Sequence, residues 1–572
     1  MCGILLHKKR NLTEDEFLSN LKKLSHRGPD GSDFKKFKDL FIGHTRLSII
    51  DLSINGLQPM VSSCNNFVLS FNGEIYNFKN LKSNLENKGY NFVSMTDSEV
   101  VLNGFIEYGN KIFEMLNGIF SIIIYDTRQD KIIIARDSFG VKPLYYFISK
   151  DQIIISSETK VFHDYCEKDE KSKILFLSHG YIPFPMTNLK DVFSFPPGCY
   201  SEIKDYKIIT RTFFDLKKTF KKKKSKKFEK KYLIDAVKYQ LMSDAKIGCF
   251  LSGGIDSTIL SFISNLINKN IETYSINFDQ FKDEKKYQKE IISMYRLKNK
   301  DLILNFNDFN ENLSDFFKHM DMPTIDGFNT FFVSKLAKEN NAKVAFSGIG
   351  SDEIFYGYST FKNLSTLKFI KYLIDFIPLK ILNNKFKKLD YLKLNSDYGI
   401  YLSKRGIFSL TEISKILDID KKLIKQYLNE FIESKSQNLE SLNLIDKMGY
   451  YEMSNYMEGQ LLKDSDIFGM ANSIEIRVPF LDNKLVNHVV GIDSNLKIHS
   501  LQNKAILIES FKNDIPESIY KRKKSGFELP YKNWLVKKGI KKTILDRYKK
   551  LKFLNKAHWS KIWALYILDI KY

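Results

Sequence analysis

A cysteine directly after the initiator methionine is the first residue of this chain that could do chemistry. The sequence begins Met-Cys-Gly, and a small second residue permits removal of the methionine. Removal would leave Cys2 with a free α-amino group, which titrates near ~7.7–8.0 and can take the proton of the residue's own thiol. Cys2 is therefore a candidate terminal nucleophile, although a lone cysteine at a chain end is more often a small apolar residue.

Two glycine turns in the second half of the chain form another candidate site. Residues 252–258 read SGGIDST and residues 346–358 read FSGIGSDEIFYGY. The first turn lies between an expected strand and an expected helix, where backbone N–H groups and the start of the helix can bind phosphate. It lacks the lysine of the GxxxxGKS/T loop, so it is a different kind of phosphate loop.

Two patterns of secondary structure position these motifs. In the first two hundred residues, apolar runs such as 118–126 and 131–137 predict strands, and 97–109 predicts an amphipathic helix, which makes an α+β domain. From residue 246, strand and helix patterns alternate and predict parallel βαβ units with ligands at the strand ends. Residues 360–470 are mainly helical and predict a helical subdomain beside the sheet.

A lysine-rich segment separates the two patterns. Residues 221–231 hold eight lysines and one glutamate, which is typical of a solvated linker. We therefore expect a first domain over 2–210, a basic linker over 211–231, a second domain over 232–545 and a helical tail over 546–572.

The composition narrows the class of protein. With 43% hydrophobic and 27% charged residues among 572, the chain is typical of a folded protein with more than one domain. Its formal charge of +22 raises nucleic acid or an anionic membrane as a partner. The linker supplies part of this charge and no nucleic-acid-binding module is visible. We therefore expect small-molecule substrates, with no nucleic acid and no membrane as partners.

The cysteines and the apolar runs indicate the compartment. Five cysteines are scattered without a CxxC pair (Cys2, Cys64, Cys166, Cys199 and Cys249), which argues against a disulfide framework or a structural zinc site. No run approaches the ~18–20 apolar residues of a membrane span, and the first ten residues become charged too early for a signal peptide. We expect a cytoplasmic enzyme. The oligomeric state stays open, with a homodimer among the alternatives.

Four motifs follow Cys2 in the first domain. They are RGPDG (27–31), HTRLSIIDL (44–52), NGEIYN (72–77) and TDSE (96–99). In type, order and spacing they resemble the class II glutamine amidotransferase domain, which has the N-terminal nucleophile (Ntn) hydrolase fold. The resemblance implies that Cys2 attacks the side-chain amide of glutamine, with the Asn72 side chain and the Gly73 N–H as oxyanion hole. It also implies a glutamine site, with Arg46 at the α-carboxylate and Glu74 and Asp97 at the α-ammonium. The full set of implied glutamine contacts is Arg46, Leu47, Ile49, Asn72, Glu74 and Asp97.

The two glycine turns resemble the motifs of the asparagine synthetase family, whose synthetase domain has an adenine nucleotide hydrolase-like fold. The resemblance implies that ATP is cleaved between the α and β phosphates and that Asp256 and Asp352 hold Mg²⁺. It further implies an ATP site formed by Leu251, Ser252, Gly253, Gly254, Asp256, Ser257, Ile276, Ser347, Gly348, Asp352 and Lys524.

Two carboxyl-terminal segments also look like this family. In KRKKSGFELPYKNWL (521–535), Lys524 is the candidate for the pyrophosphate contact, and Lys521, Arg522 and Lys523 are the alternatives. In QLLKDSDIFGMANSIEIRVPFLD (460–482), we expect Glu475 and Arg477 to form a structural ion pair at the sheet edge.

One departure from the family concerns the acceptor. The family's best-known members carry an acidic residue where this chain has Ile349, and that carboxylate is implicated in the aspartyl-adenylate half-reaction. Glu353 or a substrate oxygen would have to replace it. We expect a glutamine-dependent asparagine synthase that forms asparagine, AMP and pyrophosphate. The alternatives are a relative that amidates a uronic acid of a surface polysaccharide and, from another class, a basic nucleic-acid-binding protein on a degenerate synthetase fold.

Overall fold

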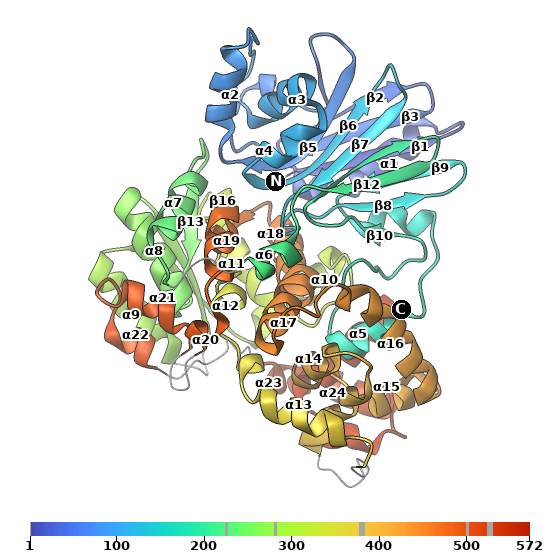
Figure 1. Ribbon diagram of the computed structural model, residues 1–572, viewed down its shortest axis with the longest axis vertical. Coiled ribbons are helices and arrows are strands. Elements are labelled where there is room, and N and C mark those ends of the chain that lie inside the picture. Colours follow the sequence, from blue (N-terminus) through green and yellow to red (C-terminus); the bar gives the residue numbers. More distant parts are fainter. Residues whose placement is uncertain (1, 223–226, 279–282, 377–383, 499–502, 523–529) are drawn as a thin grey trace.

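The computed structural model describes residues 2–222, 227–278, 283–376, 384–498, 503–522 and 530–572. Two stacked antiparallel sheets form the amino-terminal half, and a parallel sheet with helices follows (Figure 1). A group of helices lies beside the parallel sheet. The predicted architecture is confirmed: an α+β domain with two stacked antiparallel sheets precedes an α/β domain that has a parallel sheet and a helical subdomain. No helix within the described ranges is long and apolar enough to cross a membrane.

The sandwich consists of two six-stranded sheets in which every pairing is antiparallel. The order β10-β8-β9-β1-β3-β2 makes the first sheet, and β12-β11-β7-β6-β5-β4 makes the second. The strands are β1 (Gly3–Lys9), β2 (Gly31–Phe37), β3 (Leu40–Arg46), β4 (Met60–Val61), β5 (Phe67–Ile75), β6 (Gly118–Asp126), β7 (Lys131–Arg136), β8 (Tyr145–Ile148), β9 (Gln152–Ser156), β10 (Phe193–Ser194), β11 (Cys199–Lys204) and β12 (Lys207–Thr212).

Alternation along the strands builds two core layers on the first sheet. Ile4 and Leu6 of β1 pack with Ile123 and other residues of the second sheet, whereas Leu5 packs on the opposite face against Phe17, because successive side chains of a strand point to opposite faces. Phe17 lies on helix α1 (Glu14–Lys22). The outer face of the second sheet carries α2 (Phe78–Glu86), α3 (Asp97–Tyr108) and α4 (Ile112–Met115). The result is a four-layer arrangement of helices, sheet, sheet and helices.

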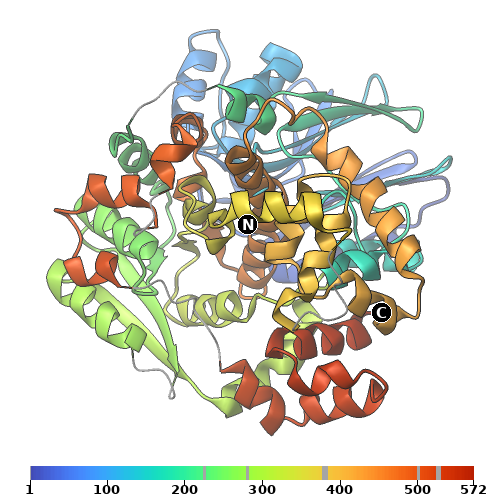
Figure 2. The ribbon, with the colours of Figure 1, turned by 60° about the horizontal axis from the view of Figure 1, so that its bottom comes forward.

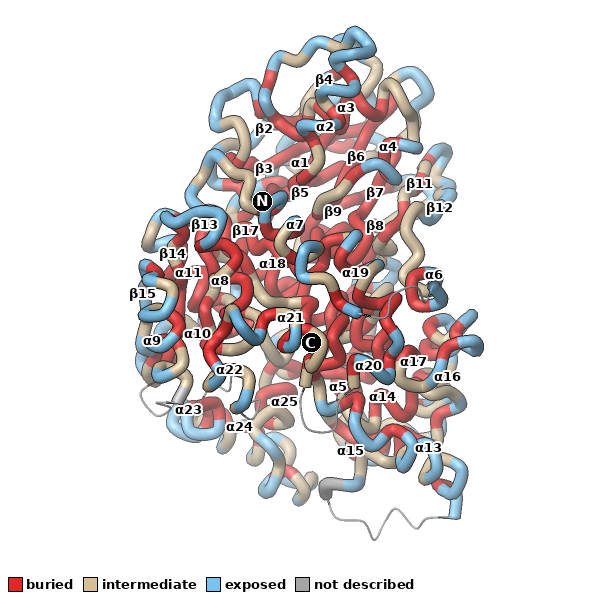
Figure 3. The backbone as a smooth tube through the Cα atoms, turned by 60° about the vertical axis from the view of Figure 1, so that its left-hand side comes forward, coloured by how far each residue is buried: buried red, intermediate tan, exposed pale blue. Residues whose placement is uncertain are grey.

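The second half contains a parallel sheet of order β15-β14-β13-β16-β17. Its strands are β13 (Ile247–Phe250), β14 (Glu272–Phe278), β15 (Lys298–Leu304), β16 (Val344–Phe346) and β17 (Glu475–Arg477). The accompanying helices are α7 (Lys231–Gln240), α8 (Ile255–Ile267), α9 (Asp283–Tyr295), α10 (Phe306–His319), α11 (Phe328–Glu339), α12 (Ser351–Ile354), α18 (Lys463–Met470), α19 (Asn483–Val490), α20 (Ser494–Lys497), α21 (Ala505–Phe511) and α22 (Glu517–Lys521). Every residue of α18 is buried, and buried residues follow the strands of both halves (Figure 3).

The helical subdomain combines segments from distant parts of the chain (Figure 2). It contains α13 (Leu364–Leu373), α14 (Tyr398–Arg405), α15 (Leu410–Leu417), α16 (Lys421–Ser436), α17 (Leu444–Tyr451) and the π-helical segment η8 (Glu452–Leu462). Helix α5 (Ser172–His179), from the sandwich part of the sequence, packs against α14 and α15. At the carboxyl end, α25 (Trp559–Lys571) packs against α23 (Tyr531–Lys537) and α24 (Ile540–Arg547). Helix α6 (Leu216–Lys221) lies within the expected linker. The domain limits drawn from the sequence stay a prediction.

Candidate active sites

Cys2 lies where the two sheets of the sandwich meet. Its side chain is in the core, with 8% of the residue exposed. Its backbone N–H donates to Asn72 Oδ1 at 3.0 Å, which ties the start of β1 to β5 of the other sheet. The next N–H, of Gly3, donates to Thr45 Oγ1 at 3.0 Å. The chain end that would carry the terminal amine is therefore fixed from both sides.

The neighbours of Cys2 suit an oxyanion hole. Asn72 is fully buried, and its Nδ2 has no hydrogen-bond partner in the described parts of the chain. A buried donor without a partner costs free energy, so Asn72 holds an amide that a ligand oxygen would satisfy. Gly73 pairs with Phe120 across β5 and β6, and a Cβ at residue 73 would lie 2.1 Å from the Ile119 carbonyl oxygen. Glycine is needed for this close approach of the strands.

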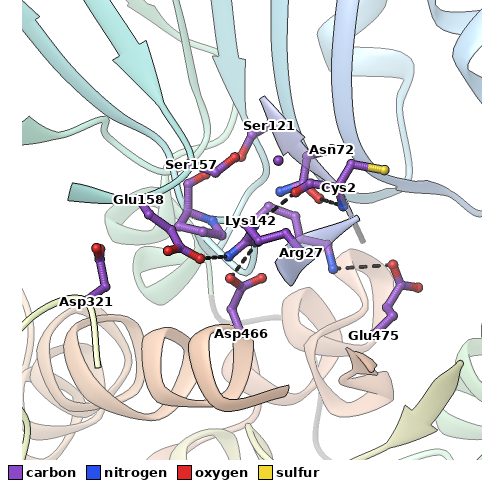
Figure 4. A network of polar contacts seen from close by, with 12 residues as sticks. Cys2, Arg27, Asn72, Ser121, Lys142, Ser157, Glu158, Asp321, Asp466 and Glu475 are labelled. Carbon is purple, nitrogen blue, oxygen red and sulfur yellow. Dashed lines mark hydrogen bonds and ion pairs between the residues drawn. The ribbon is translucent and has the colours of Figure 1, made fainter. Parts of the chain in front are cut away.

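Arg27 of the RGPDG motif joins Cys2 to the other half of the molecule (Figure 4). Its Nε donates to the Cys2 carbonyl oxygen at 3.0 Å, and its Nη1 donates to Glu158 Oε1 at 2.8 Å. Its Nη2 lies 2.7 Å from Asp466 Oδ2 of α18. All three side chains are almost completely buried. Neither Glu158 nor Asp466 was predicted as a site residue, because Glu158 lies outside the motifs and Asp466, although within the 460–482 segment, meets Arg27 only through the fold.

The predicted glutamine contacts form two groups, a segment over residues 46–49 and a pair of acids. The guanidinium of Arg46 donates to the carbonyl oxygens of Ser53 and Asp51 at 2.6 and 2.5 Å, which fixes its direction. The side chains of Leu47 and Ile49 pack in a small cluster with Val344 and Met470 of the second half. A contact between either residue and glutamine would therefore come from the backbone.

The two predicted acids lie in a strongly shielded region. Burial raises the pKa of Asp97 to about 7, although its Oδ2 accepts the Ile75 N–H at 2.8 Å. Burial also raises the pKa of Glu74 well above its usual range, while Arg477, 3.5 Å away, lowers it. Buried carboxyls with raised pKa values gain free energy when a cation binds beside them. These two carboxyls therefore suit an ammonium group.

The expected ion pair of Glu475 and Arg477 is confirmed. The two side chains of β17 are fully buried and 2.6 Å apart. Burial raises the pKa of Glu475, but Lys142 and Arg477 outweigh it and lower that pKa to about 2. Because Arg477 also reaches Glu74, the pair links the edge of the parallel sheet to one of the predicted glutamine contacts.

The nucleotide motifs meet at the carboxyl ends of the parallel strands. The SGGIDST turn connects β13 to α8, with Gly253 at φ +78° and Gly254 at the start of the helix. A left-handed φ favours glycine. The turn borders a cavity of about 360 Å³. Of the predicted ATP residues, Leu251, Ser252, Gly254, Asp256, Ser257, Ile276, Ser347, Gly348 and Asp352 line this cavity.

The structure describes two of the four candidates for the pyrophosphate contact at residues 521–524. Lys524 and Lys523 lie outside the described residues. Of the alternatives, Arg522 lies next to the turn, since its Nη2 would be 4.0 Å from a Cβ at Gly254. Lys521 instead pairs with Glu517.

Asp256 and Asp352 converge on one cation, the ammonium of Lys504. Its Nζ lies 2.6 Å from Asp256 Oδ2 and 2.9 Å from Asp352 Oδ1, and Lys504 is 3% exposed. Two carboxylates directed at one point fit Mg²⁺, which takes one or two carboxylates plus phosphate oxygens. Within the described ranges, no group of three or more His, Cys, Asp or Glu could hold a metal by itself. Lys504 was not predicted from the sequence, because it belongs to none of the motifs and reaches the site only through the fold.

Glu353 lies in the wall of the same cavity, next to Asp352. It is 1% exposed and accepts a hydrogen bond from the Tyr358 hydroxyl at 2.7 Å. Burial, and then the charge of Asp352, raise the pKa of Glu353 to about 7. A carboxyl with such a pKa can exchange a proton near neutral pH.

Comparison with known proteins gives the family. Residues 230–567 match the asparagine synthase family, and residues 1–214 match the glutamine amidotransferase domain. The chain is 30% identical over 564 residues to the glutamine-hydrolysing asparagine synthetase 1 of Bacillus subtilis (strain 168), an alignment that covers 94% of this chain and 88% of that protein. It is 25% identical over 613 residues to asparagine synthetase 3 of the same strain, covering 96% and 92%. It is 24% identical over 584 residues to the amidase chry2 of Gibberella zeae, covering 91% and 86%. The chain therefore belongs to the asparagine synthetase family and is a glutamine-hydrolysing enzyme that forms carbon–nitrogen bonds.

Proposed function

We propose that this enzyme hydrolyses glutamine at Cys2 and uses the ammonia to amidate a carboxylate that ATP has activated. The acceptor becomes an acyl-adenylate with release of pyrophosphate, and attack by ammonia gives the amide and AMP. The observation that carries the proposal is the convergence of Asp256 and Asp352 on one cation-sized point beside the phosphate loop, in a chain that also holds Cys2 against Asn72.

At the glutaminase site, the α-amine of Cys2 accepts the thiol proton and the thiolate attacks the amide carbon of glutamine. The negative oxygen that forms is stabilised by the unpartnered Nδ2 of Asn72. Ammonia leaves, and water hydrolyses the thioester to glutamate. Loss of one oxyanion donor lowers kcat by ~10²–10³ in comparable sites, so we expect this loss from Asn72→Ala.

At the synthetase site, the turn at 252–254 and the start of α8 bind phosphate oxygens. Mg²⁺ would neutralise the charge that develops on the departing pyrophosphate, and Asp256 and Asp352 would hold it. Lys504 already lies between these aspartates. With Mg²⁺ held by these aspartates, the ammonium of Lys504 would be available to contact a phosphate oxygen.

For the acceptor, we propose aspartate, which gives asparagine. Ile349 lines the cavity and cannot accept a proton. Glu353 lies in the wall of the same cavity, and its raised pKa suits it to accept the proton that ammonia loses on attack. The second candidate is a uronate acceptor. The apolar side chain of Ile349 favours it, and the name of chry2 adds that relatives of this chain are not all asparagine synthetases.

The test measures pyrophosphate release with ammonium chloride as nitrogen source, so that the glutaminase site is not needed. L-Aspartate, D-glucuronate and a nucleotide-linked glucuronate are supplied in turn with ATP and Mg²⁺. We expect AMP, pyrophosphate and asparagine from aspartate. Formation of ADP and phosphate would contradict the cleavage that we assign to the turn at 252–258. Release with a glucuronate alone would replace aspartate by a sugar acid as the acceptor.

The compartment and assembly follow from the same proposal. ATP and glutamine are cytoplasmic metabolites and Cys2 must stay reduced, so the cytoplasm is the expected location. We also propose a homodimer, and light scattering would measure the mass of the assembly in solution.

A further inference from the structure

A cavity apart from both candidate active sites lies where the sandwich meets the helical subdomain. It has a volume of about 410 Å³. Its walls come from residues beside β7, β11 and β12 on the side of the sandwich, from α6, and from α16, α17 and η8 of the helical subdomain. Among the described residues, none lines both this cavity and the nucleotide cavity. Cavities of this size bind small organic molecules in many proteins.

Much of the wall is apolar. Aromatic rings and methionines from both halves of the molecule contribute to it, namely Phe139, Phe184, Phe214, Tyr450, Met453 and Met457. The first of these and the two methionines are buried in the core. Apolar walls with a few polar groups are typical of sites for small organic ligands, because the walls hold the body of the ligand and the polar groups orient it.

Four charged side chains also line the cavity, and three of them have partners of their own. Oδ1 of Asp215 accepts the Lys217 N–H at 2.9 Å. The Oε1 atom of Glu458 lies 3.2 Å from Nη1 of the buried Arg136. The ammonium of Lys217 donates to the Gln437 carbonyl oxygen at 3.0 Å. The fourth is a lysine whose charge is not matched in this way.

This fourth residue is Lys435 of α16. It is 7% exposed, and within the described ranges its Nζ makes no hydrogen bond or ion pair. Its contacts are with aromatic faces, since Nζ lies 4.5 Å from the centre of the Phe184 ring and 5.7 Å from that of Phe431. A buried ammonium without a hydrogen-bond acceptor costs free energy. An anion in the cavity would recover this cost.

The charges around Lys435 also favour an anionic ligand. Burial lowers the pKa of Lys435 to about 7, although Glu458 raises it, and Lys463 and Lys217 lower it. In the described part of the chain these three are the charged groups that act on Lys435, from η8, α18 and α6. A carboxylate beside the amine would raise the pKa, because an opposite charge favours the charged form. Binding above neutral pH should therefore take up a proton.

We propose that this cavity is a further ligand site, which binds a small organic carboxylate with an aromatic or aliphatic body. The carboxylate pairs with the ammonium of Lys435, and the body packs against Phe184, Phe214 and Met453. The site uses none of the groups assigned to glutamine hydrolysis or ATP cleavage, so the inference is independent of the proposed function. Because its walls belong to both the sandwich and the helical subdomain, the ligand would stabilise the contact between them.

Thermal unfolding and titration calorimetry test the site, with phenylacetate and octanoate at millimolar concentration as probes. Both should raise the melting temperature of the wild type in a saturable way. Phenylacetamide has the same body without the charge, and acetate has the charge without the body. Each should bind at least about tenfold more weakly than phenylacetate. Calorimetry at pH 8 in two buffers of different ionisation enthalpy should show that phenylacetate binds with uptake of a proton.

Lys435→Met removes the ammonium and keeps an unbranched side chain. The variant should bind phenylacetate at least about tenfold more weakly, the scale of one hydrogen bond to a charged group, and lose the proton uptake. Without a probe it should melt at the same or a higher temperature, because methionine suits an apolar wall and has no charge to bury. Lys422→Met is the matched control, since Lys422 is an exposed residue of the same helix and does not line this cavity.

Three results would overturn the inference. The first is the absence of a saturable shift with both probes in the wild type, or equal binding of phenylacetate and phenylacetamide. The second is phenylacetate binding that survives unchanged in Lys435→Met, because the carboxylate would then lie elsewhere. The third is a lower melting temperature of the variant without a probe, because the lysine would then stabilise the fold through contacts already present. None of these measurements depends on pyrophosphate release, which tests the proposed function separately.

Discussion

Lys504→Met tests the assignment of the metal site through stability. The substitution keeps an unbranched side chain of similar length and removes the ammonium that lies 2.6 and 2.9 Å from Asp256 and Asp352. Breaking a fully buried pair costs ~3–5 kcal/mol. The side chains of the two aspartates are 22% and 17% exposed, so water screens part of their repulsion. We expect a loss of about 3 kcal/mol in the free energy of unfolding.

The loss should appear as a lower melting temperature. For a domain of about 300 residues, ~3 kcal/mol corresponds to a decrease of ~5 °C. The variant should regain part of this loss with millimolar MgCl₂ and no nucleotide, because the metal would neutralise the same two carboxylates. The wild type should respond less, since Lys504 already supplies the charge.

The assay is differential scanning fluorimetry at pH 7.5, with and without MgCl₂. Lys512→Met serves as control, because Lys512 pairs with Glu509 on the surface and such pairs contribute ~0–1 kcal/mol. Burial lowers the pKa of Lys504, but Asp256 and Asp352 raise it above its ordinary value overall. The lysine therefore stays charged at the pH of the assay. An unchanged melting temperature, or an equal Mg²⁺ response in variant and wild type, would refute the idea that these aspartates form one cation site.

Three further predictions concern activity. Cys2→Ala should abolish glutamine hydrolysis and preserve synthesis from ammonium chloride, because the two reactions use separate groups; loss of both activities would argue against that separation. Asp256→Asn and Asp352→Asn should each eliminate ATP cleavage and leave basal glutaminase activity, since an amide supplies oxygen without charge; surviving pyrophosphate release would count against them as metal ligands. At a fixed concentration of free ammonia, the rate of synthesis should rise with pH through about 7 as Glu353 loses its proton, and Glu353→Gln should remove this limb of the profile; an unaltered profile would assign the base elsewhere.

The sequence determined the local parts of both sites. The alternation of apolar residues predicted the strands, because successive side chains of a strand point to opposite faces. The glycines of the SGGIDST turn indicated a phosphate loop, because they permit backbone conformations that other residues avoid. The motifs around Cys2 and Asn72 indicated their family from type and order alone. These features depend on residues close together in the chain.

The tertiary structure decided which distant residues share a site. Lys504 lies 248 residues from Asp256, and β17 joins the parallel sheet beside β16 after more than a hundred intervening residues. Arg27 meets Asp466 on a helix of the other half, and Arg405 borders the same cavity as Asp326. No short-range sequence pattern predicts these contacts between distant residues. They depend on how buried faces pack once the strands and helices exist, and on the need of each buried charge for a partner of opposite sign.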